Sequence, residues 1–306
     1  MALTQAELTQ AERGAPQGQP TLEARSGVAD FSRGLDALEA PRTPARRRLD
    51  PQSVLLPVVA LAAVIVLWQL YVMTGHRRDD LVPGPADVAV TAWELMRTGA
   101  FAEAVGTSLE RGLSGFLLSI LIATPVGLLL AQVQVLRQAF GPLISGLQVL
   151  PSVAWVPAAI IWFGLTEATV YFVIFMGAIP SVVNGLIAGV RQIPPQHLRV
   201  GRVLGADRWQ MTTRIVLPAI LPSYVGGLRQ GWAFSWRSLM AAEIIATGGS
   251  MGFGMGTLLD QGRAVADMSV VLTAVLIILL VGVVVELLVF APIERRLLLT
   301  RGLLLR

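Results

Sequence analysis

Long uncharged segments dominate the hydrophobic pattern of this chain. No charged residue occurs in Pro51–Gly75, Gly112–Leu136, Gln138–Thr166 or Ala168–Val190. An α-helix needs about 20 apolar residues to cross the hydrocarbon core of a bilayer, and each of these segments is long enough. The pattern therefore predicts an all-α, polytopic membrane protein.

About six membrane spans follow from this pattern and from the apolar stretches near the end of the chain. Between them we expect two helices that do not span. One is amphipathic, begins at an N-cap Asp87, and places Val88 and Leu95 near one face. The other is a partly buried helix over Ala139–Val149. The spans are expected at Ser53–Met73, Leu113–Val133, Val153–Phe163, Ala168–Val190, Leu217–Ile245 and Met268–Phe290.

The same pattern divides the chain into four parts. Residues 1–50 are polar and contain no apolar run, so we expect a disordered tail. Residues 51–80 hold the first span and an outer loop, and residues 81–298 hold the membrane core. Residues 299–306 form a basic tail.

Composition supports a membrane protein and excludes several other functions. The chain is 54% hydrophobic and 14% charged, whereas soluble domains carry about 25% charged residues. With no cysteine, disulfides and thiolate metal sites are excluded. The two histidines, His76 and His197, fall in separate loops, so we expect no metal site. The pI near 10.5 reflects arginines gathered in loops rather than a nucleic-acid partner.

Arginines gather in alternate loops. Pro41–Arg48 carries four, and Arg191–Arg214 carries five against the single acid Asp207. Basic loops stay in the cytoplasm, and six spans then place both termini there. The glycine-rich segment Gly248–Gly256 falls on the outer side and predicts a loop or a re-entrant turn.

The sequence of the basic loop at 195–214 contains the start and stop signals of two short helices. Pro194 and Pro195 are suited to begin the first helix and Gly205 to end it, and Asp207 is suited to cap the second. Such a pair forms a surface knob that is apolar on one side and basic on the other, which suits a groove on a partner protein. The apolar positions are Leu198, Val200, Val203 and Leu204.

This loop resembles the signature of the permease subunits of bacterial ABC importers: Glu-Ala-Ala, three residues, Gly, nine residues, Ile-x-Leu-Pro. Gly205, Ile215, Leu217 and Pro218 stand at those spacings, but Arg199–Gly201 replaces Glu-Ala-Ala. Over about residues 80–298 the chain is similar to nitrate, aliphatic sulfonate, taurine and bicarbonate permeases. The segments that carry this similarity are LVPGPADV, PSVAWVPAAIIWFG, GAIPSVVNGLIAGVRQIP, GADRWQMTTRIVLPAILP and GLRQGWAFSWRSLMAAEII.

The resemblance implies a type I ABC importer permease fold in the bacterial cytoplasmic membrane. It implies three kinds of partner: a second permease copy, two ATPase subunits, and a periplasmic or lipid-anchored solute-binding protein. ATP and Mg²⁺ would bind to the ATPases, because this chain has no phosphate-binding G-x-x-x-x-G-K-[ST] motif and is expected to have no catalytic residue. The implied ATPase-coupling residues are Arg199, Val200, Gly201, Gly205, Ala206, Asp207, Trp209, Ile215, Leu217 and Pro218.

The resemblance also implies a cargo: a small anion such as a sulfonate, taurine, nitrate or a related oxyanion. Two alternatives remain open. One is an ABC permease for a pyrimidine thiamine precursor or another small organic solute. The other is a secondary transporter or channel, which would need no ATPase and would be expected to show an internal repeat.

Charges inside the fifth predicted span are the candidates for contact with solute. A charge at the bilayer centre costs roughly 3 kcal/mol, so Arg229, Arg237 and Glu243 need compensation. An arginine that faces the translocation path would attract an oxyanion through its fork of donors. Neutralisation by Glu243, Glu286 or backbone carbonyls is the structural alternative. Trp236 adjoins Arg237 and is a candidate on the same grounds.

Overall fold

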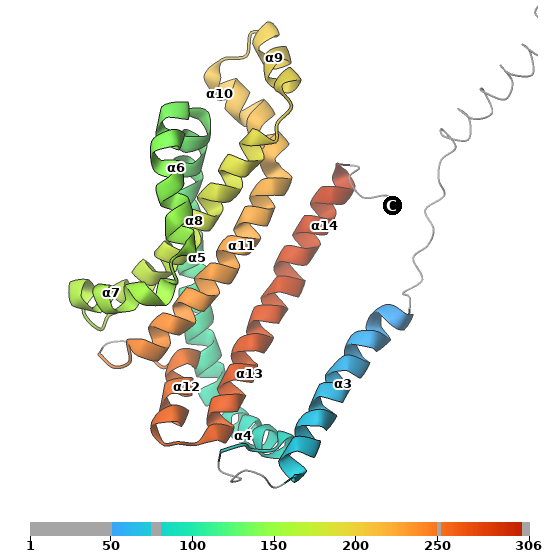
Figure 1. Ribbon diagram of the computed structural model, residues 1–306, viewed down its shortest axis with the longest axis vertical. Helices are drawn as coiled ribbons and strands as arrows, with labels where there is room; N and C mark the ends of the chain where they lie inside the picture. The colour runs from blue at the N-terminus through green and yellow to red at the C-terminus, as the bar shows by residue number, and fades with distance from the viewer. Residues whose placement is uncertain (1–50, 75–80, 250–251, 302–306) are drawn as a thin grey trace, which may run out of the picture. The chain divides into compact units, whose positions relative to one another are not determined.

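The computed structural model describes residues 51–74, 81–249 and 252–301. The predictions for residues 1–50, for His76 and for residues 302–306 fall outside these ranges. The described residues form helices and turns and contain no β-strand (Figure 1). The helices are α3 (Pro51–Met73), α4 (Pro85–Thr98), α5 (Ala100–Gln132), α6 (Gln134–Val149), η1 (Ser152–Trp155), α7 (Val156–Phe163), α8 (Glu167–Arg191), α9 (Pro195–Val203), α10 (Arg208–Gln210), η2 (Met211–Val216), α11 (Leu217–Ile245), α12 (Met255–Ala264), α13 (Met268–Val285), η3 (Glu286–Phe290) and α14 (Ala291–Thr300).

Helix α8 lies at the centre of the bundle, packed against α5 and α11. Its Ile174 and Leu186 are fully buried. At Gly185 the backbone of α8 nearly touches that of α11: a Cβ added there would lie 2.6 Å from the Cα of Gly227. Lipid tails are as apolar as leucine, so helices in membranes associate through close packing of small residues such as these.

Four helical segments are long and apolar enough to cross a membrane: α3, α5, α8 and the continuous run from α13 to α14. The pair formed by α6 and η1–α7 is a fifth candidate, bent by 98°. Helix α11 has 29 residues but is too polar to be counted among them. It occupies the place of the fifth predicted span and is covered by α8 and α5.

The third span was predicted wrongly. Val153–Phe163 is not a span of its own, because η1 and α7 together hold 12 residues (4 + 8). The preceding helix, α6, has no fully buried residue, but Ile144, Leu147 and Gln148 are partly buried, as expected for a partly buried helix there. The bend falls at Leu150, which is extended (φ −68°, ψ 125°), because a residue before a proline is driven out of the α region.

The outer segments also differ from the prediction. Asp87 is not the N-cap of α4, because Gly84 holds that position. The backbone N of Gly84 donates a hydrogen bond to the Asp87 carboxylate at 2.9 Å. The glycine-rich segment turns at Gly248 and Gly249, where φ is positive, but by Met255 it has become helix α12. The Met255 side chain is fully buried, and the sequence pattern did not predict this helix.

Candidate coupling surface and solute path

The knob, residues 195–214, begins with α9 and turns sharply at Gly205. Pro195 is the first residue of α9, and Gly205 follows its C-cap with φ +74°. The backbone N of Gly205 donates to the carbonyl of Arg202, and that of Ala206 to the carbonyl of Gly201, both at 3.0 Å. These two bonds form a Schellman motif, which needs a left-handed residue at the position of Gly205. The predicted end of the first helix is confirmed.

The second half of the knob is not a separate short helix. Asp207 caps it as predicted, because its carboxylate accepts from the backbone N of Gln210 at 2.7 Å. Helix α10 then continues through the π-helical turn η2 into α11 without a break. The wide turn precedes Pro218, which has no N–H to donate to the preceding turn. The knob is therefore continuous with α11.

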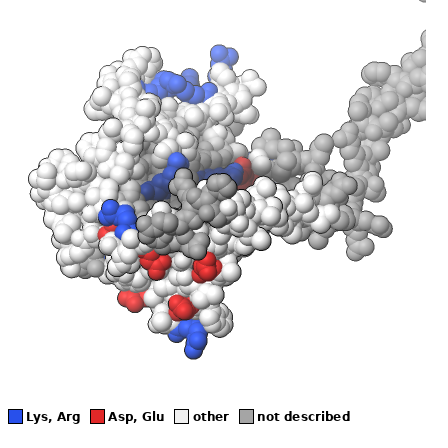
Figure 2. All heavy atoms as spheres, turned by 60° about the horizontal axis from the view of Figure 1, so that its bottom comes forward, with Lys and Arg blue, Asp and Glu red and all other residues white. Residues whose placement is uncertain are grey.

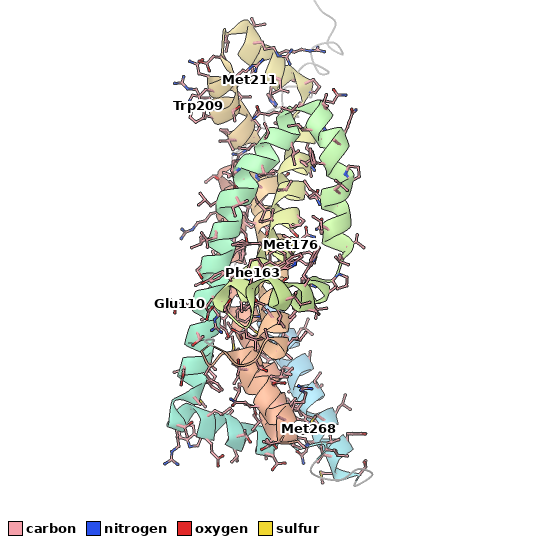
Figure 3. The ribbon with its side chains drawn as sticks, turned by 90° about the vertical axis from the view of Figure 1, so that its left-hand side faces the viewer. Glu110, Phe163, Met176, Trp209, Met211 and Met268 are labelled. Carbon is pink, nitrogen blue, oxygen red and sulfur yellow. The ribbon has the colours of Figure 1, made fainter. Side chains whose placement is uncertain are left out.

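The outer face of the knob exposes large apolar side chains. Val203 is 86% exposed, Leu204 79% and Trp209 75%, and Trp209 projects at the end of the bundle in Figure 3. On the inner face Gly201 is buried, and a Cβ there would lie 2.3 Å from Ile215 Cδ1. Contiguous exposed apolar residues at the end of a bundle are typical of a surface that binds another protein.

The remaining predicted coupling residues divide between these two faces. Arg199, Val200, Gly205 and Asp207 are exposed, whereas Ala206, Ile215 and Leu217 are partly buried; Pro218 is exposed at the start of α11. Arg199 forms no ion pair with any carboxylate in the described part of the chain. All ten residues thus lie in one continuous stretch of structure.

Charge is distributed unequally between the two ends of the bundle. Figure 2, in which the end with α4 and α12 is turned forward, shows most of the acidic side chains in the lower part of the view with basic side chains beside them, and only basic side chains along the upper edge. The end with α4 and α12 carries Asp87, Glu94, Glu103, Asp260 and Asp267 beside Arg97 and Arg263. The end with the knob carries Arg137, Arg191, Arg199, Arg202, Arg208, Arg214, Arg295 and Arg296 beside Asp207 and Glu294.

Glu243 lies in a buried ionic network that the sequence analysis missed. Its side chain is 1% exposed. Its carboxylate accepts from Arg111 Nη1 at 3.0 Å, from Ser108 Oγ at 2.7 Å and from the backbone N of Gly256 at 3.0 Å. Arg111 also binds Glu167 through Nε at 2.9 Å and through Nη2. The network ties α5, the start of α8, α11 and the start of α12 together.

Arg229 is neutralised near the middle of α11. Its guanidinium forms ion pairs with Glu286 and with Glu294, the latter at 3.1 Å. The glutamates lie on the continuous helix α13–η3–α14, so the pairs join this helix to α11. One of them, Glu286, is a partner considered from the sequence.

Arg237 differs from Arg111 and Arg229 because it forms no ion pair in the described part of the chain. Its Nε donates to the carbonyl of Ala233 at 3.0 Å, and its guanidinium carbon lies 4.6 Å from the ring centre of Phe234. It lines a cavity of about 280 Å³, here called the Arg237 pocket. Other residues of this pocket include Gln148, Ser152, Met176, Gly177, Phe234 and Ala241.

Trp236 does not line the Arg237 pocket, but together with Arg237 and Glu286 it borders a separate cavity of about 560 Å³. It is 7% exposed and stacks on Trp232, with ring centres 5.7 Å apart. The four candidates inside the fifth predicted span therefore do not form one site. Among the described residues there is also no group of three or more His, Cys, Asp or Glu side chains that could hold a metal ion.

A bundle of long apolar helices that presents an exposed apolar knob at one end, joined without a break to the long helix α11, fits the architecture of an ABC importer permease. The chain belongs to the family described as binding-protein-dependent transport system inner membrane components, which matches residues 123–297.

Relatives in this family carry different substrates in their names. The bicarbonate transport system permease protein CmpB of Synechococcus elongatus is 31% identical over 66% of this chain and 75% of its own length. The nitrate import permease protein NrtB of Synechocystis is 29% identical over 68% and 80%. The riboflavin transport system permease protein RibX of Chloroflexus aurantiacus is 30% identical over 77% and 86%.

A solved structure supports the fold. A chain of the MetNI methionine ABC transporter superposes with a TM-score of 0.54 at 18% identity. The match covers 67% of this chain and 96% of that one. The type I permease fold expected from the resemblance is confirmed.

Proposed function

We propose that this chain is the permease subunit of an ATP-driven importer for a small anion. The observation that supports an anionic cargo is that Arg237 has no carboxylate partner among the described residues. Arg111 and Arg229 are each bound by two carboxylates, whereas Arg237 has none among the described residues and lines a pocket between α6, α8 and α11. The Arg237 side chain is exposed at the mouth of this pocket, and a guanidinium without a carboxylate partner on a helix of the bundle offers its donors to an anion.

The proposed assembly contains two copies of this chain, two ATPase subunits and a solute-binding protein outside the cell. The knob and both termini face the cytoplasm of a bacterial inner membrane, which the arginine-rich end of the bundle supports. ATP and Mg²⁺ bind to the ATPases, and this chain holds neither. Closure of the ATPase pair moves the knob as a rigid body, and α10 passes that motion into α11.

The size and lining of the Arg237 pocket support a small oxyanion. Stacking on Phe234 leaves the Nη donors of Arg237 free of hydrogen bonds to other described residues, and Gln148 and Ser152 add neutral donors. A cavity of about 280 Å³ holds nitrate, bicarbonate or a short sulfonate together with water. A small organic solute is the second candidate, favoured by the riboflavin permease among the relatives.

Uptake by the reconstituted complex separates these cargoes. The permease, its ATPase subunits and its binding protein are placed in liposomes, and ATP-driven uptake is measured with nitrate, bicarbonate, taurine and riboflavin as probes. We expect Arg237→Gln to abolish uptake of the anion while assembly and basal ATPase activity persist, and Arg237→Lys to retain part of it. Uptake of riboflavin alone, or anion uptake unchanged in Arg237→Gln, contradicts the proposed cargo class.

The need for an ATPase partner separates this proposal from a secondary transporter or channel. We expect Val203→Asp and Trp209→Asp to lose copurification with the ATPase subunits, because each places a charge in the apolar face of the knob. The control is Val265→Asp, which changes a side chain that is 74% exposed at the other end of the bundle. Transport by this chain without any ATPase would refute the importer.

A further inference from the structure

A second cavity follows the Arg237 pocket along the seam between α6 and α8. It measures about 460 Å³ and is here called the Arg191 pocket. Met176 of α8 lines the first pocket and Arg191 the second. At a rise of 1.5 Å per residue these residues are about 20 Å apart along the helix. Because α8 runs toward the knob (Figure 1), the second pocket lies at the knob end of the seam.

Two guanidinium groups line the Arg191 pocket. Arg137 from α6 and Arg191 from the last turn of α8 both border it, and neither forms an ion pair with a described carboxylate. One donor of Arg137, Nη1, is used on the carbonyl of Ala131 at 3.0 Å. Arg191 makes no side-chain hydrogen bond within the described part of the chain. Two like charges on one cavity repel each other, and a bound anion removes that repulsion.

Neutral donors connect this cavity with the Arg237 pocket. Asn184 lines the Arg191 pocket and donates through Nδ2 to Oε1 of Gln148 at 2.6 Å, and Gln148 lines the Arg237 pocket. Ser145 contributes a hydroxyl to the Arg191 pocket. The amide pair thus stands between two cationic cavities. Elsewhere in the bundle, Arg111 and Arg229 are neutralised by carboxylates, so the described arginines that lack ion pairs on α6, α8 and α11 all border this seam.

We propose that the Arg191 pocket is a second station for the transported oxyanion, on the cytoplasmic side of the Arg237 pocket. This inference rests on the proposed function, because it takes the seam between α6 and α8 as part of the path. The ligand is a free oxyanion held by the guanidinium forks of Arg137 and Arg191. The NH₂ groups of Asn184 and Gln148 donate hydrogen bonds to it as it passes between the two stations.

A single thiol reports the charge of this pocket. The chain contains no cysteine, so Ser145→Cys gives it one thiol on the pocket wall. The variant is assembled with its ATPase subunits in phosphatidylcholine nanodiscs. It is treated with methanethiosulfonate reagents carrying either an ethylsulfonate or an ethyltrimethylammonium group, and the mass of the permease subunit is followed. The quantity compared is the ratio of the reaction rate with the anionic reagent to the rate with the cationic reagent. We expect this ratio to be about tenfold higher at the Ser145→Cys thiol than at an exposed reference thiol.

Three further results complete the test. Adding Arg191→Gln should remove most of that preference, and Arg191→Lys should restore it. The matched control Arg296→Gln, which removes an arginine from α14 at the same end of the bundle, should leave it unchanged. Millimolar nitrate should slow the anionic reagent severalfold. A preference that survives Arg191→Gln together with Arg137→Gln overturns the proposal, and so does protection that requires phosphatidylglycerol, which would identify a lipid headgroup site.

The failure of this inference is distinguishable from failure of the proposed function. If Arg237→Gln abolishes ATP-driven uptake while Arg191→Gln leaves its rate unchanged, the second station is wrong and the importer stands. If uptake needs no ATPase, the proposed function is wrong whatever the thiol reports.

Discussion

Glu243→Gln tests the buried network most sharply, because it removes one negative charge and almost no volume. The parent carboxylate accepts from Ser108, Arg111 and Gly256. A glutamine offers one carbonyl oxygen and turns an NH₂ group toward one of these donors. One buried donor is then left without an acceptor, and Arg111 keeps Glu167.

The expected loss of stability is large for a single isosteric change. Removing one member of a buried ion pair costs about 3–5 kcal/mol. Because Arg111 retains a carboxylate, we expect the lower end, about 3 kcal/mol. In a chain of this size each kcal/mol shifts the melting temperature by about 2–4 °C, so the midpoint should fall by about 6–12 °C.

The assay is thermal unfolding of the full chain in detergent, followed by the fluorescence of its seven tryptophans. Asp260→Asn is the matched control, because it breaks an ion pair with Arg263, whose side chain is 71% exposed. Such pairs contribute about 0–1 kcal/mol, so the control should fall by no more than about 4 °C. A Glu243→Gln midpoint within about 2 °C of the parent refutes the structural role. Lost transport at an unchanged midpoint would instead make Glu243 a gating group.

Three further predictions concern backbone geometry. Gly227→Ala should lower the unfolding midpoint, since overpacking costs about 1–3 kcal/mol and its Cβ would lie 2.9 Å from the Cα of Gly185; Gly226→Ala, with no atom within 4 Å, should leave it unchanged or raise it, and equal effects would contradict the close contact. Gly205→Ala should speed hydrogen exchange in the knob about fivefold, because a left-handed residue costs about 1 kcal/mol, whereas Gly205→Asn should stay near the parent. Asp207→Ala should cost about 1 kcal/mol through the lost N-cap and should therefore speed hydrogen exchange of the α10 amides by a similar factor. Unchanged exchange in α10 would show that the cap is not formed.

The features predicted correctly from the sequence are those encoded within a few residues. Pro195, Gly205 and Asp207 set the ends of the knob's helices through their own backbone preferences and short-range bonds, so their spacing was enough. The Arg111–Glu243 pair joins residues 132 positions apart, and no local pattern shows which charge meets which. Arg111 stands immediately before an uncharged segment, which is the signal that would have placed it inside a span.

The bend of α6 and η1–α7 was missed for a different reason. Hydropathy shows that a segment is apolar, but it does not show whether the helix in that segment is straight or bent. The proline at position 151 was the available sign of a break in the helix. Helix α11 shows the reverse case: its charges lower its hydropathy, yet tertiary packing against α8 covers it. Its arginines were visible in the sequence, but the partners of Arg229 and the lack of an ion pair at Arg237 required the fold.

The most direct measurement is sided labelling of a Val203→Cys variant, whose thiol would be the single one on a chain without cysteine. A membrane-impermeant maleimide is applied to inverted and right-side-out membrane vesicles, with Val265→Cys as the control for the opposite end. We predict that Val203→Cys reacts in inverted vesicles only and becomes protected when the ATPase subunits are assembled. Reaction from the outside, or labelling that the ATPase subunits leave unchanged, would contradict a knob that receives the motion of nucleotide turnover.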